Sequence, residues 1–181
     1  MLFRSYRHYK AIAEAVDLPL VLYNIPGRTG VNMFPATIAR LAVIETIVGV
    51  KEGSGVIQQA SDIVQTCGDR LAVLAGDDAM TLPMMAVGGK GVITVTANIA
   101  PTEMANMVKA FAAGNIEEAR RIHFQLSPLF AALFYETNPI PVKEALGMMG
   151  KIDPELRLPL CSMGKDNREK LMQVMKEGRF I

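Results

Sequence analysis

Three side chains near the ends of two apolar segments could together carry out carbonyl chemistry. Tyr23 closes the segment "LPLVLYNI", Lys51 closes "IVGVKE", and Arg28 lies in the loop after the first segment. A lysine that loses its water and its proton becomes an amine nucleophile, which forms an imine with a carbonyl. A tyrosine hydroxyl can donate and accept the protons that this reaction moves. A guanidinium can hold a carboxylate through two hydrogen bonds.

Each of these residues also has a simpler explanation when it is taken alone. The stem of Lys51 can pack while its amine reaches solvent. Tyr23 can end a strand with its hydroxyl in water, and Arg28 can be a solvated loop residue. The spacing favours the chemical interpretation, because one strand–helix–strand repeat separates Tyr23 from Lys51 and would place them on neighbouring parallel strands.

Other candidates are weaker. The segment Gly76–Asp77–Asp78 could orient a substrate hydroxyl or amine, or it could be a turn that caps the next helix; both interpretations stay open. The only two histidines, His8 and His123, are far apart in the sequence, and no cluster has metal-ligand spacing. We expect no metal and no cofactor.

The remaining composition bounds the class of protein. Cys67 and Cys161 are expected to be reduced core thiols without chemistry. Half of the 181 residues are hydrophobic, a fifth are charged, and the formal net charge is +1, which suggests neither nucleic acid nor a membrane as partner. No signal peptide or membrane span is evident, and a cytoplasmic location is expected.

Short apolar segments alternate with helical patterns through the first hundred residues. The segments are nearly continuous in hydrophobicity, as in a parallel sheet that is covered on both faces. They predict strands at 18–25, 47–52, 71–78 and 91–97. Helices are predicted before and between them, at 5–16, 34–42, 55–67 and 79–88. This order indicates an α/β fold with right-handed crossovers, whose sites form at the carboxyl ends of the strands.

The rest of the chain is predicted to be helical. One helix runs from about Pro101 to Gly114, and Asn115 begins the next with Glu118 in a capping box. That second helix is predicted to be interrupted or kinked near Pro128, and a charged helix follows at 165–177. We therefore predict two domains, a sheet domain at 1–100 and a helical region at 101–181.

Five motifs in series resemble the dihydrodipicolinate synthase family of pyruvate-dependent aldolases. They are "YNIPGRTG", "GVKEGSG", "LAGDDA", "GGKGVITVTANIAP" and "NPIPVKEAL". The resemblance implies a (β/α)₈ barrel, and the motifs match its second half. We therefore expect strands 5–8 of a TIM barrel followed by a C-terminal helical domain, with the first four units, including a "GTTGE"-like segment, absent from this chain.

The resemblance also implies roles for single residues. Lys51 is similar to the lysine that forms an imine with pyruvate, and Tyr23 to the tyrosine that relays protons. Arg28 is similar to the arginine that binds the carboxylate of aspartate 4-semialdehyde. Gly76 and Asp77 resemble the segment that lines the amino and aldehyde end of that substrate. Ile93 resembles the residue whose carbonyl faces the catalytic lysine.

The expected function is the synthase reaction of lysine biosynthesis, in which a Lys51 imine of pyruvate condenses with aspartate 4-semialdehyde. Because the implied proton-relay partners of Tyr23 are missing, we expect low or no turnover from this chain. The alternatives are a non-catalytic half-barrel that only self-associates, and a related pyruvate-dependent aldolase of the N-acetylneuraminate lyase or keto-sugar acid type. Open sheet edges predict a homo-oligomer.

Overall fold

The computed structural model describes residues 2–181 and contains a four-stranded sheet followed by helices. Up to Ile93, a first compact unit holds α1 (Leu2–Ala15), β1 (Leu20–Asn24), α2 (Pro26–Thr29), α3 (Pro35–Leu41), β2 (Ile47–Glu52), α4 (Ile57–Cys67), η1 (Gly68–Arg70), β3 (Ala72–Ala75), η2 (Asp78–Met80), α5 (Thr81–Ala86) and β4 (Gly91–Val92). From Thr94, a second unit holds η3 (Thr96–Asn98), α6 (Pro101–Ala112), α7 (Ile116–Ala132), α8 (Ile140–Met148) and α9 (Lys165–Glu177). The predicted domain limits at 1–100 and 101–181 stay a prediction.

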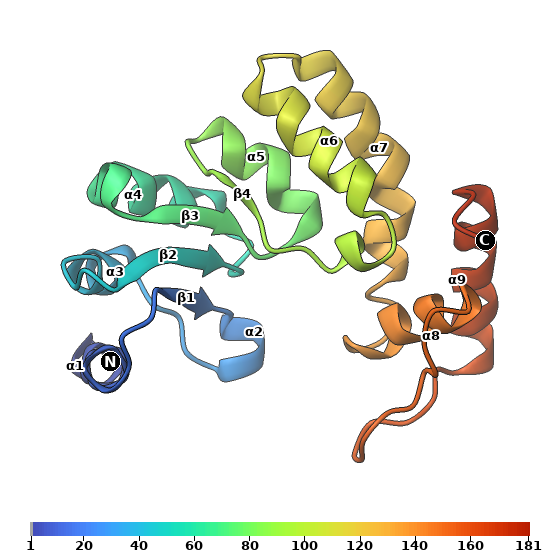
Figure 1. The fold of residues 1–181 in the computed structure, drawn as a ribbon, viewed down its shortest axis with the longest axis horizontal. Coiled ribbons are helices and arrows are strands. Elements are labelled where there is room, and N and C mark those ends of the chain that lie inside the picture. Colours follow the sequence, from blue (N-terminus) through green and yellow to red (C-terminus); the bar gives the residue numbers. More distant parts are fainter. Residues whose placement is uncertain (1) are drawn as a thin grey trace. The chain divides into compact units, whose positions relative to one another are not determined.

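The sheet is parallel, and its strands lie in chain order, β1-β2-β3-β4. Figure 1 shows the arrowheads of β1, β2 and β3 pointing the same way, so their carboxyl ends share one edge of the sheet. The register across the sheet pairs Tyr23 with Lys51, Lys51 with Leu74, and Leu74 with Gly91. This row crosses all four strands close to that edge.

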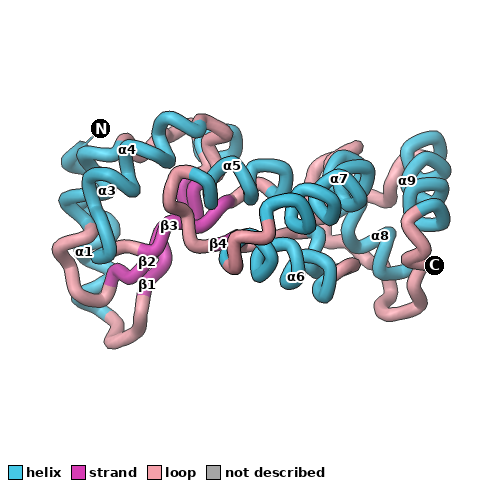
Figure 2. Tube along the Cα trace, turned by 90° about the horizontal axis from the view of Figure 1, so that it is seen from above, coloured by secondary structure: helices cyan, strands magenta, loops and turns pink. Residues whose placement is uncertain are grey.

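One face of the sheet is packed against helices. Leu22, Val50 and Val73 are almost fully buried on this face, where they join a core with residues of α3 and α4 such as Ile38 and Ile63. Figure 2 shows α1, α3 and α4 on the same side of the strands. Because side chains alternate along a strand, the residues between these core positions point to the other face.

That other face is open in the described part of the chain. Val21 and Tyr23 are exposed there, and the neighbouring Lys51 and Leu74 are only partly buried. Continuous apolar strands predict a sheet covered on both faces, as is usual for parallel strands. Within the first unit only one face is covered.

The predicted elements of the first unit form with small shifts at their ends. β4 is only Gly91–Val92, because the backbone beyond it leaves the ladder and turns into η3. α2 was predicted as loop. It forms one helical turn in which Pro26 occupies the first helical position and Gly30 closes the turn at φ 68°. A run of glycine and threonine around Arg28 hides this turn from sequence patterns.

The predicted numbering of the strands as fifth to eighth of a barrel does not hold. In the structure they are β1–β4, the first strands of the chain. The physical reason is that barrel strands are repeats, so each makes the same parallel ladder with its neighbours wherever it stands. The residues of a strand therefore do not show which place the strand takes in the order of the barrel.

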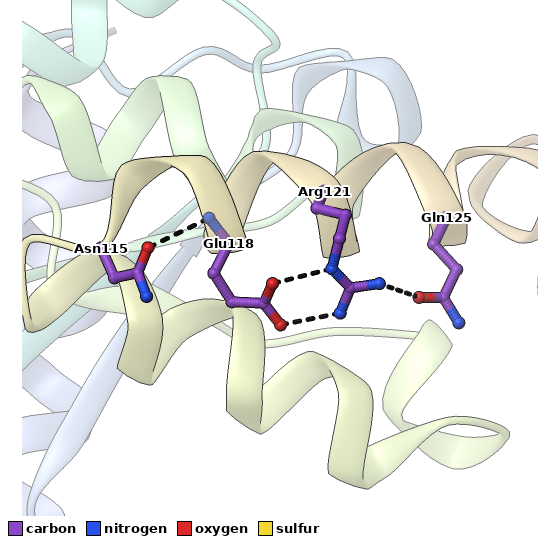
Figure 3. A network of polar contacts seen from close by, with 4 residues as sticks. All are labelled: Asn115, Glu118, Arg121 and Gln125. Atoms are coloured by element: carbon purple, nitrogen blue, oxygen red, sulfur yellow. Dashed lines mark hydrogen bonds and ion pairs between the residues drawn. The ribbon is translucent and has the colours of Figure 1, made fainter.

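In the second unit, α7 begins where the sequence predicts. The side-chain oxygen of Asn115 accepts a hydrogen bond from the backbone N–H of Glu118 at 3.2 Å (Figure 3). The Glu118 carboxylate does not complete the predicted capping box; it pairs with Arg121 through two hydrogen bonds of 2.7 Å. These bonds hold the pKa of Glu118 below its ordinary value. α7 then runs through Pro128 to Ala132.

The two cysteines differ in their surroundings. Cys67 is buried in the core of the first unit, and desolvation raises the pKa of its thiol. Cys161 is exposed, so only one of the two predicted core thiols lies in a core. Both are free thiols.

Candidate active site

Tyr23 and Lys51 meet on the open face of the sheet. They are register partners on β1 and β2, and the Lys51 Nζ lies 4.3 Å from the centroid of the Tyr23 ring. An ammonium at this distance is attracted by the face of the ring. The contact orients a flexible lysine on a rigid strand, so the amine is presented at a fixed place while it stays partly open to solvent.

Arg28 lies just beyond the carboxyl end of β1, in the last turn of α2. The backbone N–H groups of Arg28 and Thr29 both donate to the carbonyl of Ile25 at 3.1 Å, which closes the turn. The Thr29 hydroxyl has two acceptors within reach of its single proton, Ile25 O at 3.0 Å and Val31 O at 3.1 Å. An exposed guanidinium is thus carried on a tight, internally bonded turn, as a carboxylate clamp requires.

Gly76 and Asp77 follow β3. Asp77 forms the turn and helix cap that the sequence left open as one interpretation, and Gly76 allows a close approach of the backbone. The Asp77 carboxylate accepts a hydrogen bond from the backbone N–H of Ala79 at 2.9 Å and caps η2. Gly76 donates to Glu52 O at 2.7 Å, and a Cβ at Gly76 would lie 2.9 Å from that oxygen and from Gly53 Cα. The backbone after β3 therefore approaches the end of β2 closely at Glu52 and Gly53, which only glycine permits.

Ile93 follows β4 and extends the same edge of the sheet. Its backbone N–H donates to Ala75 O at 3.0 Å, and its side chain is exposed. The structure thus brings Tyr23 and Lys51 into contact and places Gly76 one residue beyond Glu52 in the ladder. Arg28, Asp77 and Ile93 follow the carboxyl ends of three different strands.

Sequence reasoning missed a polar network behind Tyr23 and Lys51. Asn24 and Glu52, the next residues along β1 and β2, are 1% and 2% exposed. Asn24 Nδ2 donates to Glu52 Oε2 at 2.9 Å, and Gln59 Nε2 donates to the same oxygen at 3.1 Å. The alternation of side chains along a strand could have revealed them, because Asn24 and Glu52 each lie two residues after a buried apolar residue, Leu22 and Val50, and so point to the same buried face.

A hollow of about 290 Å³ opens beside Tyr23. It lies between α1, β1 and the loop after α2, and its lining includes Arg4, His8, Tyr23 and Thr29. This hollow gives one flank of Tyr23 access to solvent.

Within residues 2–181, no group of three or more histidine, cysteine, aspartate or glutamate side chains is placed to hold a metal ion. No helix in that part of the chain is long and apolar enough to cross a membrane.

The sequence matches one protein family over nearly its whole length. The family model described as the dihydrodipicolinate synthetase family covers residues 4–178. The chain belongs to this family. The 4-hydroxy-tetrahydrodipicolinate synthase of Geobacter sp. (strain M21) is 56% identical over 176 residues, and that of Thermodesulfovibrio yellowstonii is 54% identical over 176 residues. These alignments cover 97% of this chain but only 61% and 60% of the relatives, so the chain spans about three fifths of their length.

Solved structures of the family agree with the fold. Dihydrodipicolinate synthase from Thermotoga maritima matches with a TM-score of 0.97 at 43% identity, over 100% of this chain and 63% of that one. The chloride-inhibited enzyme from Acinetobacter baumannii, solved in complex with pyruvate, matches with a TM-score of 0.96 at 42% identity, over 100% of this chain and 62% of that one. A third match is described as the first monomeric dihydrodipicolinate synthase variant.

These matches correct the predicted fold class. The match to the Thermotoga maritima enzyme runs over the entire chain, with β1–β4 at its start and the helices included. The description as strands 5–8 of a barrel with an added C-terminal helical domain is therefore wrong. What holds is that the chain matches part of the TIM-barrel structures of this family.

Proposed function

We propose that this chain carries imine-forming residues of a 4-hydroxy-tetrahydrodipicolinate synthase, with pyruvate as the carbonyl substrate and Lys51 as the nucleophile. Because the chain spans about three fifths of its relatives, activity, substrates and partners belong to the proposal. The contact between Lys51 Nζ and the Tyr23 ring, at the carboxyl ends of two parallel strands, is the observation that carries it.

The proposed steps assign one task to each residue. The neutral amine of Lys51 attacks the ketone carbon of pyruvate and gives a carbinolamine. Tyr23 supplies the proton with which the hydroxyl of that carbinolamine leaves as water, and an imine remains. Loss of a methyl proton from the imine gives an enamine, whose carbon attacks the aldehyde of aspartate 4-semialdehyde. Arg28 binds the carboxylate of this second substrate.

Residues that follow β3 and β4 complete the lining of the proposed site. Gly76 and Asp77 follow β3 beside β2, and Ile93 follows β4. We assign Gly76 and Asp77 to the lining of the second substrate's site and the Ile93 carbonyl to the surroundings of the Lys51 amine. No cofactor enters this scheme, since the imine at Lys51 supplies the electron sink.

Trapping of the imine tests the proposal. The chain is incubated with pyruvate and borohydride, which reduces an imine to a stable amine, and its mass is compared with that of Lys51→Ala. Lys90→Ala is the matched control, because Lys90 is an exposed lysine in the loop before β4, paired only loosely with Asp69 at 3.8 Å. We expect the adduct in the wild type and the control, and none in Lys51→Ala.

The predicted low turnover is tested separately from imine formation. A coupled assay with both substrates measures turnover, whereas borohydride trapping needs only pyruvate. An adduct that persists in Lys51→Ala would contradict the assignment of Lys51 whatever the turnover is.

A further inference from the structure

The polar network behind Lys51 ties β2 to both ends of the loop that carries Arg28. At the start of the loop, Asn24 Nδ2 donates to Glu52 Oε2 at 2.9 Å and to Asn32 Oδ1 at 2.8 Å. At its end, Asn32 Nδ2 donates to Gln59 Oε1 at 2.9 Å, and Met33 N donates to Asn24 Oδ1 at 2.9 Å. Residues 25–32 are therefore held at two points by side chains that converge on Glu52.

Glu52 accepts three hydrogen bonds and donates none in the interactions that define the network. Its Oε2 accepts from Asn24 and Gln59, and its Oε1 accepts from the backbone N–H of Ser54 at 2.7 Å. The residue is 2% exposed, so water does not replace a lost partner at these oxygens. An ionised carboxylate, which only accepts, fits three donors; a protonated carboxyl or an amide would turn a donor toward one of them.

The direction of these bonds is fixed by two backbone groups that cannot turn over. Met33 N–H requires the carbonyl of Asn24, which leaves the Asn24 amide to face Glu52. Ser54 N–H requires an acceptor at the other oxygen of Glu52. A glutamine at position 52 would therefore face a donor with its own NH₂ in either orientation, and flipping the Asn24 amide would set it against Met33 N–H.

We propose that Glu52 is a positioning residue, which acts as an ionised carboxylate to hold the loop of Arg28 in place for a carboxylate-bearing substrate. The role of Arg28 rests on the proposed function; the fixing of the loop does not. Because the Glu52 side chain lies on the buried face of β2 and Lys51 on the open face, Glu52 acts on the loop and not on the amine.

Hydrogen exchange tests the fixing of the loop. In Glu52→Gln, the amides of Arg28, Thr29 and Met33 are expected to exchange about tenfold faster than in the wild type, since an unpaired buried donor favours local opening. Glu118→Gln is the control: it makes the same change in an exposed network on α7 (Figure 3). Protected amides of β2 and β3 report that the variant is folded.

A second variant covers the outcome in which Glu52→Gln does not fold. Asn32→Ala removes the Asn32 bonds to Asn24 and Gln59 at the far end of the loop, so that only the bond from Met33 N to Asn24 holds this end. Glu52 keeps its bonds from Asn24, Gln59 and Ser54. Asn32→Ala should speed exchange of the loop amides in the same direction. Unchanged exchange of the loop in folded Glu52→Gln and in Asn32→Ala would overturn the proposal.

The effect of Glu52 on the binding of aspartate 4-semialdehyde is measured by borohydride trapping of pyruvate at Lys51. Aspartate 4-semialdehyde should consume the enamine and lower the trapped pyruvate adduct, and the concentration that halves the adduct measures how well this substrate is held. Glu52→Gln should raise that concentration about tenfold and leave the pyruvate dependence unchanged. In an Arg28→Ala background the same change should add nothing, because Glu52 acts through Arg28.

The two proposals fail differently. If the wild type forms no adduct at Lys51, the proposed function is wrong, while exchange of the loop still decides the role of Glu52. If Glu52→Gln loosens the loop but its effect on the second substrate persists in Arg28→Ala, the positioning of Arg28 by Glu52 is wrong.

Discussion

The hydroxyl of Tyr23 is the proton donor in the proposed formation of the imine. Tyr23→Phe keeps the ring against which the Lys51 Nζ lies but removes the proton donor. We expect imine formation with pyruvate to slow by about 10²-fold or more, the usual contribution of a positioned acid or base. The rate of borohydride-trapped adduct formation measures this. Tyr135→Phe, at a tyrosine of the second unit, should leave the rate unchanged, and an equal rate in Tyr23→Phe would remove Tyr23 from the mechanism.

His123 sets a pH dependence that is unrelated to the site. It is partly buried on α7 beside the Phe130 ring, its Nδ1 has no hydrogen-bond partner among the described residues, and desolvation lowers its pKa below the ordinary 6.5. Near pH 6.5 the unfolded chain therefore binds a proton that the folded chain does not. It follows that the free energy of unfolding falls as the pH drops below about 6.5.

Replacement of this histidine should flatten that part of the stability curve. The free energy of unfolding is measured with urea at a series of pH values from 7 downward. We expect it to fall less steeply with decreasing pH in His123→Phe than in the wild type. His8→Asn changes the other, exposed histidine and should keep the wild-type slope. A wild-type slope in His123→Phe would contradict the assignment.

At the scale of elements, the close approach of β2 and β3 depends on Gly76. A Cβ there would lie 2.9 Å from two backbone atoms of the neighbouring strand end, which cannot move aside as a flexible side chain would. Gly76→Ala should lower the free energy of unfolding by about 1–3 kcal/mol. Gly27→Ala, where nothing lies within 4 Å, should change it by less than about 0.5 kcal/mol. Urea denaturation measures both, and similar values for the two would contradict the close approach.

The sequence predicted the elements better than it predicted what surrounds them. Strand β2 and helix α9 have the predicted limits, because a continuous apolar segment and a charged helical segment between glycines are local signals. The contact of Tyr23 with Lys51 was predictable from the repeat that separates them. The bonds of Glu52 were not, since they depend on which side chains of β1, β2, α4 and the loop after α2 meet in space.

At the scale of the whole molecule, the open face of the sheet is an expected site of self-association. Within residues 2–181, β1 and β4 are edge strands, and the exposed apolar side chains beside them include Val21 at 47% and Ile93 at 41%. Edges of this kind pair with further strands unless charge prevents it. We expect an oligomer by gel filtration with light scattering.

A charge on the edge strand should weaken this association. Val21→Lys places an ammonium on β1 and should shift the chain toward the monomer. Val43→Lys makes the same change at an exposed valine between α3 and β2 and should not. A monomeric wild type would contradict the predicted self-association.

The location of the trapped pyruvate decides whether Lys51 is the nucleophile. After incubation with pyruvate and borohydride, the protein is digested and the modified peptide is identified by mass. We expect a single modified position, Lys51, in the peptide that carries "GVKEGSG". A modification spread over exposed lysines such as Lys90, or no modified peptide at all, would contradict it.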